Sequence, residues 1–340
     1  MLRLTVIFLV VNLTLLRYRR FKMIKINLKK LGTVLFLLSA VSFKLCAELN
    51  VIPMVNFGTL QLKDENYLFS PSGTLMFKYN KPEEDTSNLP DVIAGSISYG
   101  QDIISKGLEG FEEKQFHSIG AFGKLAFGRN TFLLKVTDRG AHPFESYKNF
   151  EGLLFYSREL IKNDSMTLSV GGGLAATDTG ITLGGVDIFV VPLPMVYFAY
   201  KNQLIKTEME WVGLPMLNLL LFPENNLRVR GIAALAGFDL PTDFQWDLAL
   251  CWYPLKNEPF NELVSVSAGI ASNVKKLRIN VENSMKFQYY CAYGEVSITA
   301  LTIRGGYAFG GKQVLRANGN KFSTDYDGGF YATISGMYKF

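Results

Sequence analysis

Apolar and polar residues alternate one by one over long stretches of this chain, and this period constrains the fold more than any other feature. From Lys276 to Gln288 every even-numbered residue is polar, and every odd-numbered residue except Asn283 is apolar. Alternate residues of a β-strand point to opposite faces of the sheet, so this pattern predicts one long strand with an apolar face. Such a strand would extend about 43 Å, which is long for a soluble protein.

Other segments repeat the alternation. One parity of 246–252 is apolar and carries a tryptophan at each end, Trp246 and Trp252. Aromatic residues gather at both interfaces of a membrane-spanning barrel, so this arrangement favours strands that cross a bilayer. The same period predicts strands within 74–79, 93–99, 132–137, 166–174 and 264–270.

The N-terminal region has the three parts of a secretory signal. Within 23–47, a basic stretch precedes an apolar run over 31–43, and the small residue Ala47 stands before an expected cut at Glu48. The apolar run is too short to span a bilayer, which needs about 20 residues. We expect residues 1–22 to be an extension from a misassigned start, with the true start left open.

Charge is distributed unevenly between this region and the rest of the chain. Residues 1–47 hold nine of the 35 lysines and arginines and no acidic residue, so 26 cations and 30 acids remain from Glu48 onward, a net charge of −4. Nucleic-acid binding needs a basic surface, so we expect no nucleic-acid partner. After Ala47 no apolar run is long enough for a membrane helix.

Residue types that carry catalysis or bind metals are sparse. The chain has two histidines, His117 and His142, and neither has a nearby serine or carboxylate pattern typical of a nucleophile and its base. We therefore expect no enzyme activity, no cofactor and no metal site. Cys251 and Cys291 are expected to be free or buried thiols, although pairing stays open. Cys46 offers a lipid-attachment alternative, which the bulky residues before it disfavour.

The last eleven residues have an apolar parity that ends in two aromatics: Phe330, Ala332, Ile334, Gly336, Tyr338 and Phe340. This pattern resembles the closing strand of bacterial outer-membrane β-barrels, whose C-terminal aromatic is read by the assembly machinery. The resemblance implies an all-β fold in which residues 48–340 form a single transmembrane antiparallel β-barrel. It also implies location in the outer membrane, outer-membrane lipid and the barrel-assembly machinery as partners, and Tyr338 and Phe340 as the assembly signal.

Turn signals give a count of about 14 strands, with a range of about 12 to 16. Short turns are expected at 129–130, 163–164, 201–202, 241–243 and 273–275, and longer loops at 139–149, 176–184, 214–225 and 255–261. The count comes out odd, which a closed antiparallel barrel with both termini on one side excludes. Either Arg304–Gly306 is a missed turn or one early strand is false.

Charged residues recur on the polar parity of three predicted strands, and we expect them to line the lumen: Lys206, Glu208, Glu210, Arg228, Arg230, Lys276, Arg278, Glu282 and Lys286. The segments 203–213 and 226–238 are expected to be neighbours that pair carboxylates with guanidinium groups. Two interpretations stay open: a polar channel whose charges filter solutes, or an ion-pair network that fills a narrow interior.

Pro192 and Pro194 interrupt an otherwise strand-like segment and predict a bulge, a kink or an edge, because proline cannot donate to the ladder. The segment 213–223 that follows is unusually apolar for a loop. The pair loosely resembles the strand kink through which fatty-acid transporters of the outer membrane release hydrophobic cargo. Packing of the segment at the rim or in the lumen is the favoured alternative.

These observations lead to two hypotheses about function. The first is an outer-membrane channel or transporter for small or hydrophobic solutes. The alternative is a non-conducting structural or surface-interaction barrel that acts through extracellular loops at 101–114, 139–149 and 310–328. The sequence does not identify the solute, the oligomeric state or whether the lumen is open.

Overall fold

The computed structural model describes residues 49–62, 66–82, 89–106, 113–145, 149–176, 182–183, 186–187, 190–212, 214–235, 243–255, 263–278, 283–317, 320–325 and 327–337. The expected extension at 1–22, the signal peptide at 23–47 and the assembly signal at Tyr338 and Phe340 lie outside these residues.

The described residues form β-strands almost throughout. The strands are β1 (Asn50–Gln61), β2 (Tyr67–Asn80), β3 (Val92–Ile104), β4 (Gln115–Phe127), β5 (Asn130–Gly140), β6 (Phe150–Lys162), β7 (Met166–Ala176), β8 (Thr182–Leu183), β9 (Val186–Asp187), β10 (Val190–Lys201), β11 (Ile205–Val212), β12 (Leu214–Leu221), β13 (Leu227–Leu235), β14 (Phe244–Trp252), β15 (Val264–Arg278), β16 (Ser284–Ile298), β17 (Leu301–Ala317), β18 (Asn320–Asp325) and β19 (Gly329–Met337). No helix in the described ranges is long and apolar enough to span a membrane.

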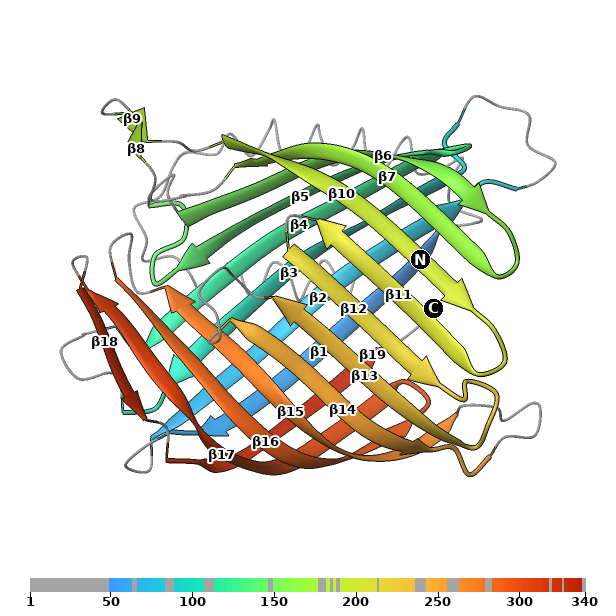
Figure 1. Ribbon diagram of the computed structural model, residues 1–340. Helices are drawn as coiled ribbons and strands as arrows, with labels where there is room; N and C mark the ends of the chain where they lie inside the picture. The colour runs from blue at the N-terminus through green and yellow to red at the C-terminus, as the bar shows by residue number, and fades with distance from the viewer. Residues whose placement is uncertain are drawn as a thin grey trace, which may run out of the picture. The chain divides into compact units, whose positions relative to one another are not determined.

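The strands close into an antiparallel barrel (Figure 1). Each strand of the wall pairs with the next, β7 pairs with β10, and β19 pairs with both β17 and β1, which closes the sheet. Within the described residues the sheet has 17 strands, of which β18 pairs with β17 alone, so the wall itself has 16. The expected fold class is confirmed, and the count is at the upper end of the expected range. The short strands β8 and β9 pair only with each other.

Two errors in strand assignment come from misplaced turns, and the second of them lowers the count. The alternating segment 276–288 is not one strand, because β15 ends at Arg278 and β16 begins at Ser284. The period continues across this reversal because the polar residues Asn280 and Glu282 suit a turn as well as a polar strand face. The turn expected at 273–275 is likewise wrong, since those residues lie inside β15.

The second error is the apolar loop expected at 214–225. Residues Leu214–Leu221 are β12, which pairs with β11 and β13. An apolar segment suits a strand that exposes one face to lipid, and β11 and β12 are separated by the single residue Gly213. The alternative that Arg304–Gly306 form a turn is also wrong, because these residues lie within β17. The chain reverses at Thr299 and Ala300 instead.

The barrel has a turn end and a loop end. At the turn end, connections of two or three residues join β4 to β5, β6 to β7, β10 to β11 and β16 to β17, as expected for 129–130, 163–164 and 201–202. The start of β1 and the end of β19 lie at this end. β13 ends and β14 begins at the loop end, so the short turn expected at 241–243 is assigned to the wrong end; β14 ends and β15 begins at the turn end, where a long loop was expected at 255–261.

The outer surface of the wall is apolar. Leu134, Leu250 and Trp252 are each about half exposed, and Phe330 is 71% exposed, whereas Tyr331 beside it is 6% exposed. Strand pairing keeps the same parity on the outside from strand to strand around the wall. A soluble sandwich would bury these side chains, while a closed barrel leaves no unpaired edge and can present them to lipid. The chain is therefore an outer-membrane-type β-barrel.

Glycines on the inner face are covered by aromatic rings from neighbouring strands. A Cβ atom at Gly173 would meet the Leu154 backbone oxygen and the Phe155 ring, and one at Gly306 would meet the Ala292 backbone oxygen and the Tyr331 ring. A ring that lies over a neighbouring glycine fixes the register of the two strands and bends the sheet.

Candidate channel lumen

The inner face of the barrel is divided into regions of different chemistry. Short polar side chains recur on the inward parity of β19, β1, β2, β3 and β4, among larger ones such as Met54, Met76 and Phe122. The short polar residues are Thr333, Ser335, Asn56, Ser70, Ser72, Thr74, Ser96, Ser98 and Ser118. Short hydroxyl side chains leave room beside the wall and provide donors and acceptors for water. We call this region the hydroxyl wall.

A network of ion pairs lies on the inner face of β13, β14, β16 and β17. The Arg304 guanidinium donates to Glu295 Oε2 from Nε at 2.7 Å and to Asp247 Oδ2 from Nη1 at 3.1 Å. Arg230 donates from Nη1 to Glu295 Oε1 at 3.3 Å and from Nη2 to Tyr293 Oη at 3.1 Å. The Tyr293 hydroxyl donates to Asp247, and its ring lies 4.0 Å from Arg304 Cζ.

This network is neutral, because two guanidinium groups face two carboxylates. Glu295 and Asp247 are 7% and 14% exposed, and the two arginines are 29% and 21% exposed. Groups this buried need partners, and planar guanidinium groups suit carboxylates on neighbouring strands. All the contacts run along one side of the wall, so the network does not need to cross the lumen.

Of the expected lumen residues, Arg228 and Arg230 on β13 and the three residues of β11 have the inward parity. Lys206 and Glu208 form an exposed ion pair of 3.1 Å. The two strands are not neighbours, however, because β12 lies between them. The expected pairing of carboxylates on β11 with guanidinium groups on β13 is therefore wrong, and Arg230 pairs with residues of β14 and β16 instead.

The remaining expected lumen residues are placed differently. Lys276 is exposed, and it pairs with Lys286 on the parity opposite to the inward-facing residues of β15 and β16. Arg278 has the same parity as Lys276, and Glu282 lies outside the described residues. Lys286 is buried and forms an ion pair of 2.9 Å with Asp243.

Sequence reasoning missed Asp247, Glu295, Arg304 and Tyr293. Asp247 could have been found, because it alternates with Trp246 and Leu248 in a strand that was recognised. The others could not, since the sequence pattern gave no clear strand boundaries between 289 and 328 and the inward parity was therefore unknown.

The prolines of β10 lie beyond the end of β11. Pro192 and Pro194 pair with β7 in an unbroken register, whereas in the described part of β11 the pairing with β10 begins at Met195. The unbroken register excludes a bulge between these strands. An edge with one partner is the setting in which proline is tolerated.

The inward face next to these prolines is apolar. Its residues come from the loop-end parts of four successive strands: Val191, Leu193, Met195, Val212, Leu214, Met216, Ile232 and Ala234. We call this region the apolar wall.

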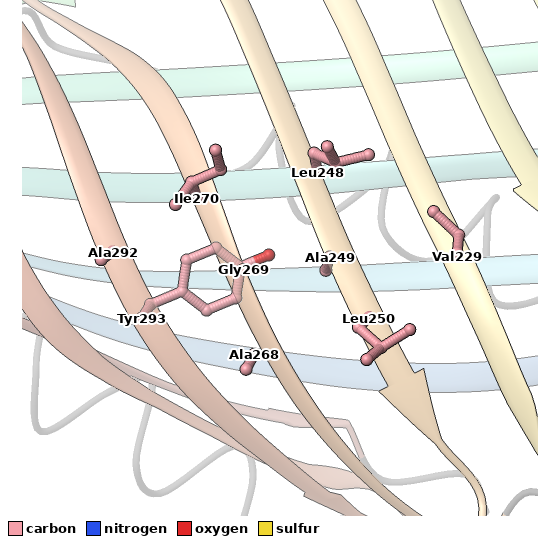
Figure 2. A pocket seen from close by; sticks show the side chains of 9 residues that line it. All are labelled: Val229, Leu248, Ala249, Leu250, Ala268, Gly269, Ile270, Ala292 and Tyr293. Carbon is pink, nitrogen blue, oxygen red and sulfur yellow. The ribbon is translucent and has the colours of Figure 1, made fainter.

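A hollow of about 520 Å³ lies on the lipid-facing side of β13 to β16 (Figure 2). Leu248, Leu250 and Ile270 border it, and each is about half exposed. Figure 2 shows the Tyr293 ring lying over the neighbouring strand at Gly269, so the wall between the hollow and the ion network is thin.

Other candidate chemistry is limited in the part of the chain that the structure describes. Cys251 and Cys291 are free and buried. His117 Nδ1 is 2.8 Å from the Tyr99 hydroxyl on the outer surface. No group of three or more metal-ligating residues occurs within the described ranges.

Comparison with known proteins gives limited information. No protein-family model matches the chain, and a search of curated proteins found no match. Among solved structures, CdiB from Escherichia coli aligns with 85% of this chain at 11% identity and a TM-score of 0.49, and the aligned part is 63% of CdiB. A triple mutant of the Rhodopseudomonas blastica porin aligns with 86% of this chain and 99% of its own, at 8% identity and a TM-score of 0.40. At these values the likeness adds nothing to what strand pairing shows.

Proposed function

We propose that this protein is a channel or transporter that carries small or hydrophobic solutes across the bacterial outer membrane. The observation that carries the proposal is the hydroxyl wall, which begins beside a self-contained ion network, since Arg304 of β17 pairs with Thr333 of β19. Five adjacent strands present short polar side chains inward, and the strong charges of the network pair with one another on one side. An interior that served only structure would be expected to fill that space with larger side chains.

The apolar wall supports the hydrophobic alternative within the same proposal. It lies on β10 to β13 near the loop end, while the hydroxyl wall lies on β19 and β1 to β4. A solute with an apolar part could contact the former while its polar part stays hydrated beside the latter. Conduction of ions and passage of apolar solutes are therefore measured separately.

The test is reconstitution of the refolded barrel into lipid. We expect stepwise ion conductance in planar bilayers, and swelling of liposomes in isotonic solutions of small sugars. Uptake of a fluorescent fatty acid into vesicles measures the hydrophobic alternative. A folded barrel that shows no conductance, no swelling and no uptake would overturn the proposal.

A second function is favoured by the projecting hairpin of β17 and β18. All six residues of β18 are exposed, and Phe322 is 57% exposed although β18 takes no part in closing the wall. A surface-interaction barrel would use this hairpin. Deleting 317–325 should abolish attachment of expressing cells to their target surface while leaving the barrel folded; unchanged attachment would count against this function.

Three further expectations remain proposals. Location in the outer membrane and recognition of Tyr338 and Phe340 by the barrel-assembly machinery follow from the resemblance of the last strand. Deleting Phe340 should reduce the amount of folded barrel in the outer-membrane fraction. We also propose that the barrel is not an enzyme, because His117 is paired with a tyrosine on the lipid-facing surface.

A further inference from the structure

Two strands from opposite sides of the barrel meet at the loop end. Counting from β15 through β16, β17, β19, β1, β2, β3 and β4 to β5 takes eight steps, and the opposite direction also takes eight. These strands are thus as far apart around the wall as two strands can be. Their ends nevertheless approach each other. One side of the wall therefore leans across the mouth of the lumen.

The part that leans across consists of 275–278 of β15 and 284–288 of β16, which we call the crossing segment. On its inner side, Lys275 Nζ lies 2.7 Å from Asp102 Oδ1, on β3. The Ser70 hydroxyl of β2 donates to the same carboxylate oxygen at 2.6 Å. β3 is six strands away from β15 around the shorter path, so this ion pair spans the lumen.

Apolar contacts reinforce the crossing. Leu277, Met285 and Phe287 of the crossing segment are 1%, 3% and 1% exposed. They belong to one buried cluster with residues from the far side of the mouth: Leu60, Leu62, Leu68, Ile104, Phe116 and Ala141. Side chains this buried on the inner face of a wide barrel require a covering layer, which the opposite strands supply.

An irregularity in the sheet lies beside the point where the crossing begins. The register of β16 with β17 shifts between Tyr289 and Tyr290, where Gly310 and Gly311 of β17 have positive φ angles of 61° and 128°. A Cβ atom at Gly311 would meet the Gln288 backbone oxygen. A bulge bends its strand and increases the local twist, so this one accounts for a change of direction just before the crossing segment.

The two ion pairs that hold the crossing segment differ in burial. Lys286 and Asp243, on its outer side, have side chains 7% and 2% exposed. Lys275 and Asp102, on its inner side, have side chains 35% and 17% exposed. A partly solvated pair separates more readily than a fully buried one. The inner pair is thus the weaker attachment.

From this geometry we infer that the crossing segment is a lid over the loop end of the lumen, with Lys275 and Asp102 as its latch. Solutes pass when the latch opens and the segment moves away from β3 and β5, while the bulge and the Lys286–Asp243 pair keep its other side attached. This inference rests on the proposed channel function. Its structural part, the contact across the mouth, can be tested without any conduction.

The first experiment compares single-channel recordings of Asp102→Asn and Lys275→Gln with those of the natural sequence. Each variant should raise the ratio of open to closed time about two- to fivefold, the change that corresponds to losing one partly exposed ion pair. The exchanged double variant D102K/K275D should restore the original ratio. The matched control is Lys276→Gln, which removes the same charge from the next residue, on the exposed face, and should leave the ratio unchanged.

The second experiment links the two sides of the mouth. Cysteines at 102 and 275 are joined with a short bis-maleimide that a reductant can cleave, and the linked peptides are identified by mass spectrometry. We expect linkage in the double variant only, low conductance while the link is intact, and recovery after cleavage.

The outcomes separate the two ideas. If linkage forms but no variant conducts, the crossing exists and the channel function is wrong. If the barrel conducts but Asp102→Asn and Lys275→Gln leave the gating ratio unchanged, or the linked barrel conducts as well as the cleaved one, the lid is wrong. Absence of linkage in a folded double variant would also overturn the lid.

Discussion

The glycines of this barrel differ in what lies beside them. At some positions another group occupies the space that a Cβ atom would take, and at others that space is empty. At Gly173 on β7, an added Cβ would meet the Leu154 backbone oxygen and the Phe155 ring, which is itself 1% exposed. At Gly123 on β4, an added Cβ would meet nothing within 4 Å. Backbone cannot move aside as a flexible side chain can, so the two positions should respond differently to the same substitution.

Gly173→Ala should therefore destabilise the barrel by about 1–3 kcal/mol, the usual effect of overpacking. Gly123→Ala is the matched control and should change stability by less than about 0.5 kcal/mol. The midpoint of urea unfolding in lipid vesicles, followed by tryptophan fluorescence, measures both. Equal midpoints would show that Phe155 does not depend on the space at Gly173.

Arg304 is the residue on which the ion network depends most, because it donates to both carboxylates. Arg304→Gln leaves Glu295 and Asp247 with only Arg230 as a cationic partner, and the wall gains one net negative charge. We expect a shift of the reversal potential toward cations in a salt gradient. Breaking a buried pair should also lower stability by about 3 kcal/mol.

The double variant R304Q/E295Q supplies the control, since it removes one charge of each sign. Its reversal potential should return toward that of the natural sequence. Unchanged selectivity in the single variant would show that solutes do not pass near this network.

For a single residue, the sequence predicts which face of the sheet the side chain occupies more readily than which residue it contacts. The exposed parity of Trp246, Leu248 and Trp252 is visible in the alternation alone, and Asp247 must then point inward. Its contact with Arg304 depends on pairing between β14, β15, β16 and β17, and no local pattern encodes that register. The ion network consequently appears only once the strands are placed.

Strand boundaries are predicted well where the turn between two strands has distinctive residues and poorly where it does not. Asn163 illustrates the first case, since its side-chain oxygen accepts from the backbone N–H groups of Ser165 and Met166 and the turn was expected there. The reversal between β15 and β16 illustrates the second, because polar turn residues continue the polar parity of the strand. The hairpin of β11 and β12 has one intervening residue, too few to form a recognisable loop signal.

β10 provides a test of how a strand's pairing determines which residues it tolerates. Val196 pairs with Val170 on β7 and with Trp211 on β11, whereas Pro194 pairs, among the residues that the structure describes, with β7 alone. Val196→Pro removes a donor where both neighbouring strands are present, so we expect loss of about 1–3 kcal/mol or failure to assemble.

The matched change Pro194→Ala should leave assembly intact, because that part of β10 has an unpaired side. The fraction of protein that migrates as a compact folded band before heating measures both. Comparable assembly of the two variants would contradict the edge assigned to the prolines.

At the scale of the whole molecule, the strands close into a barrel. The sequence predicts this closure but not the number of strands in the wall. Long alternating segments with aromatic ends exclude a soluble sandwich, because too many apolar side chains would remain uncovered. The count of 16 requires the β11–β12 hairpin and the β15–β16 reversal, both of which lack clear local signals. The contact across the mouth is even harder to predict from the sequence, since it joins Lys275 to Asp102, residues that are distant in sequence and on non-neighbouring strands.

Closure also determines which of two adjacent, chemically identical residues meets lipid, and this gives the last prediction. Leu134 of β5 is 50% exposed on the outer surface, while Leu133 has the inward parity, opposite Lys124 and Phe155. A lysine at 134 would place a charge in the apolar belt, at a cost of about 2–4 kcal/mol near the middle of the bilayer. A lysine at 133 would face the lumen, where repulsion by Lys124 costs about 0.2–1 kcal/mol.

Leu134→Lys should therefore lower the urea midpoint in vesicles much more than Leu133→Lys. In detergent micelles, which adapt to the added charge, the difference between the variants should shrink. The reverse order in vesicles would mean that the two faces of the wall have been exchanged, and with them every lumen residue assigned above.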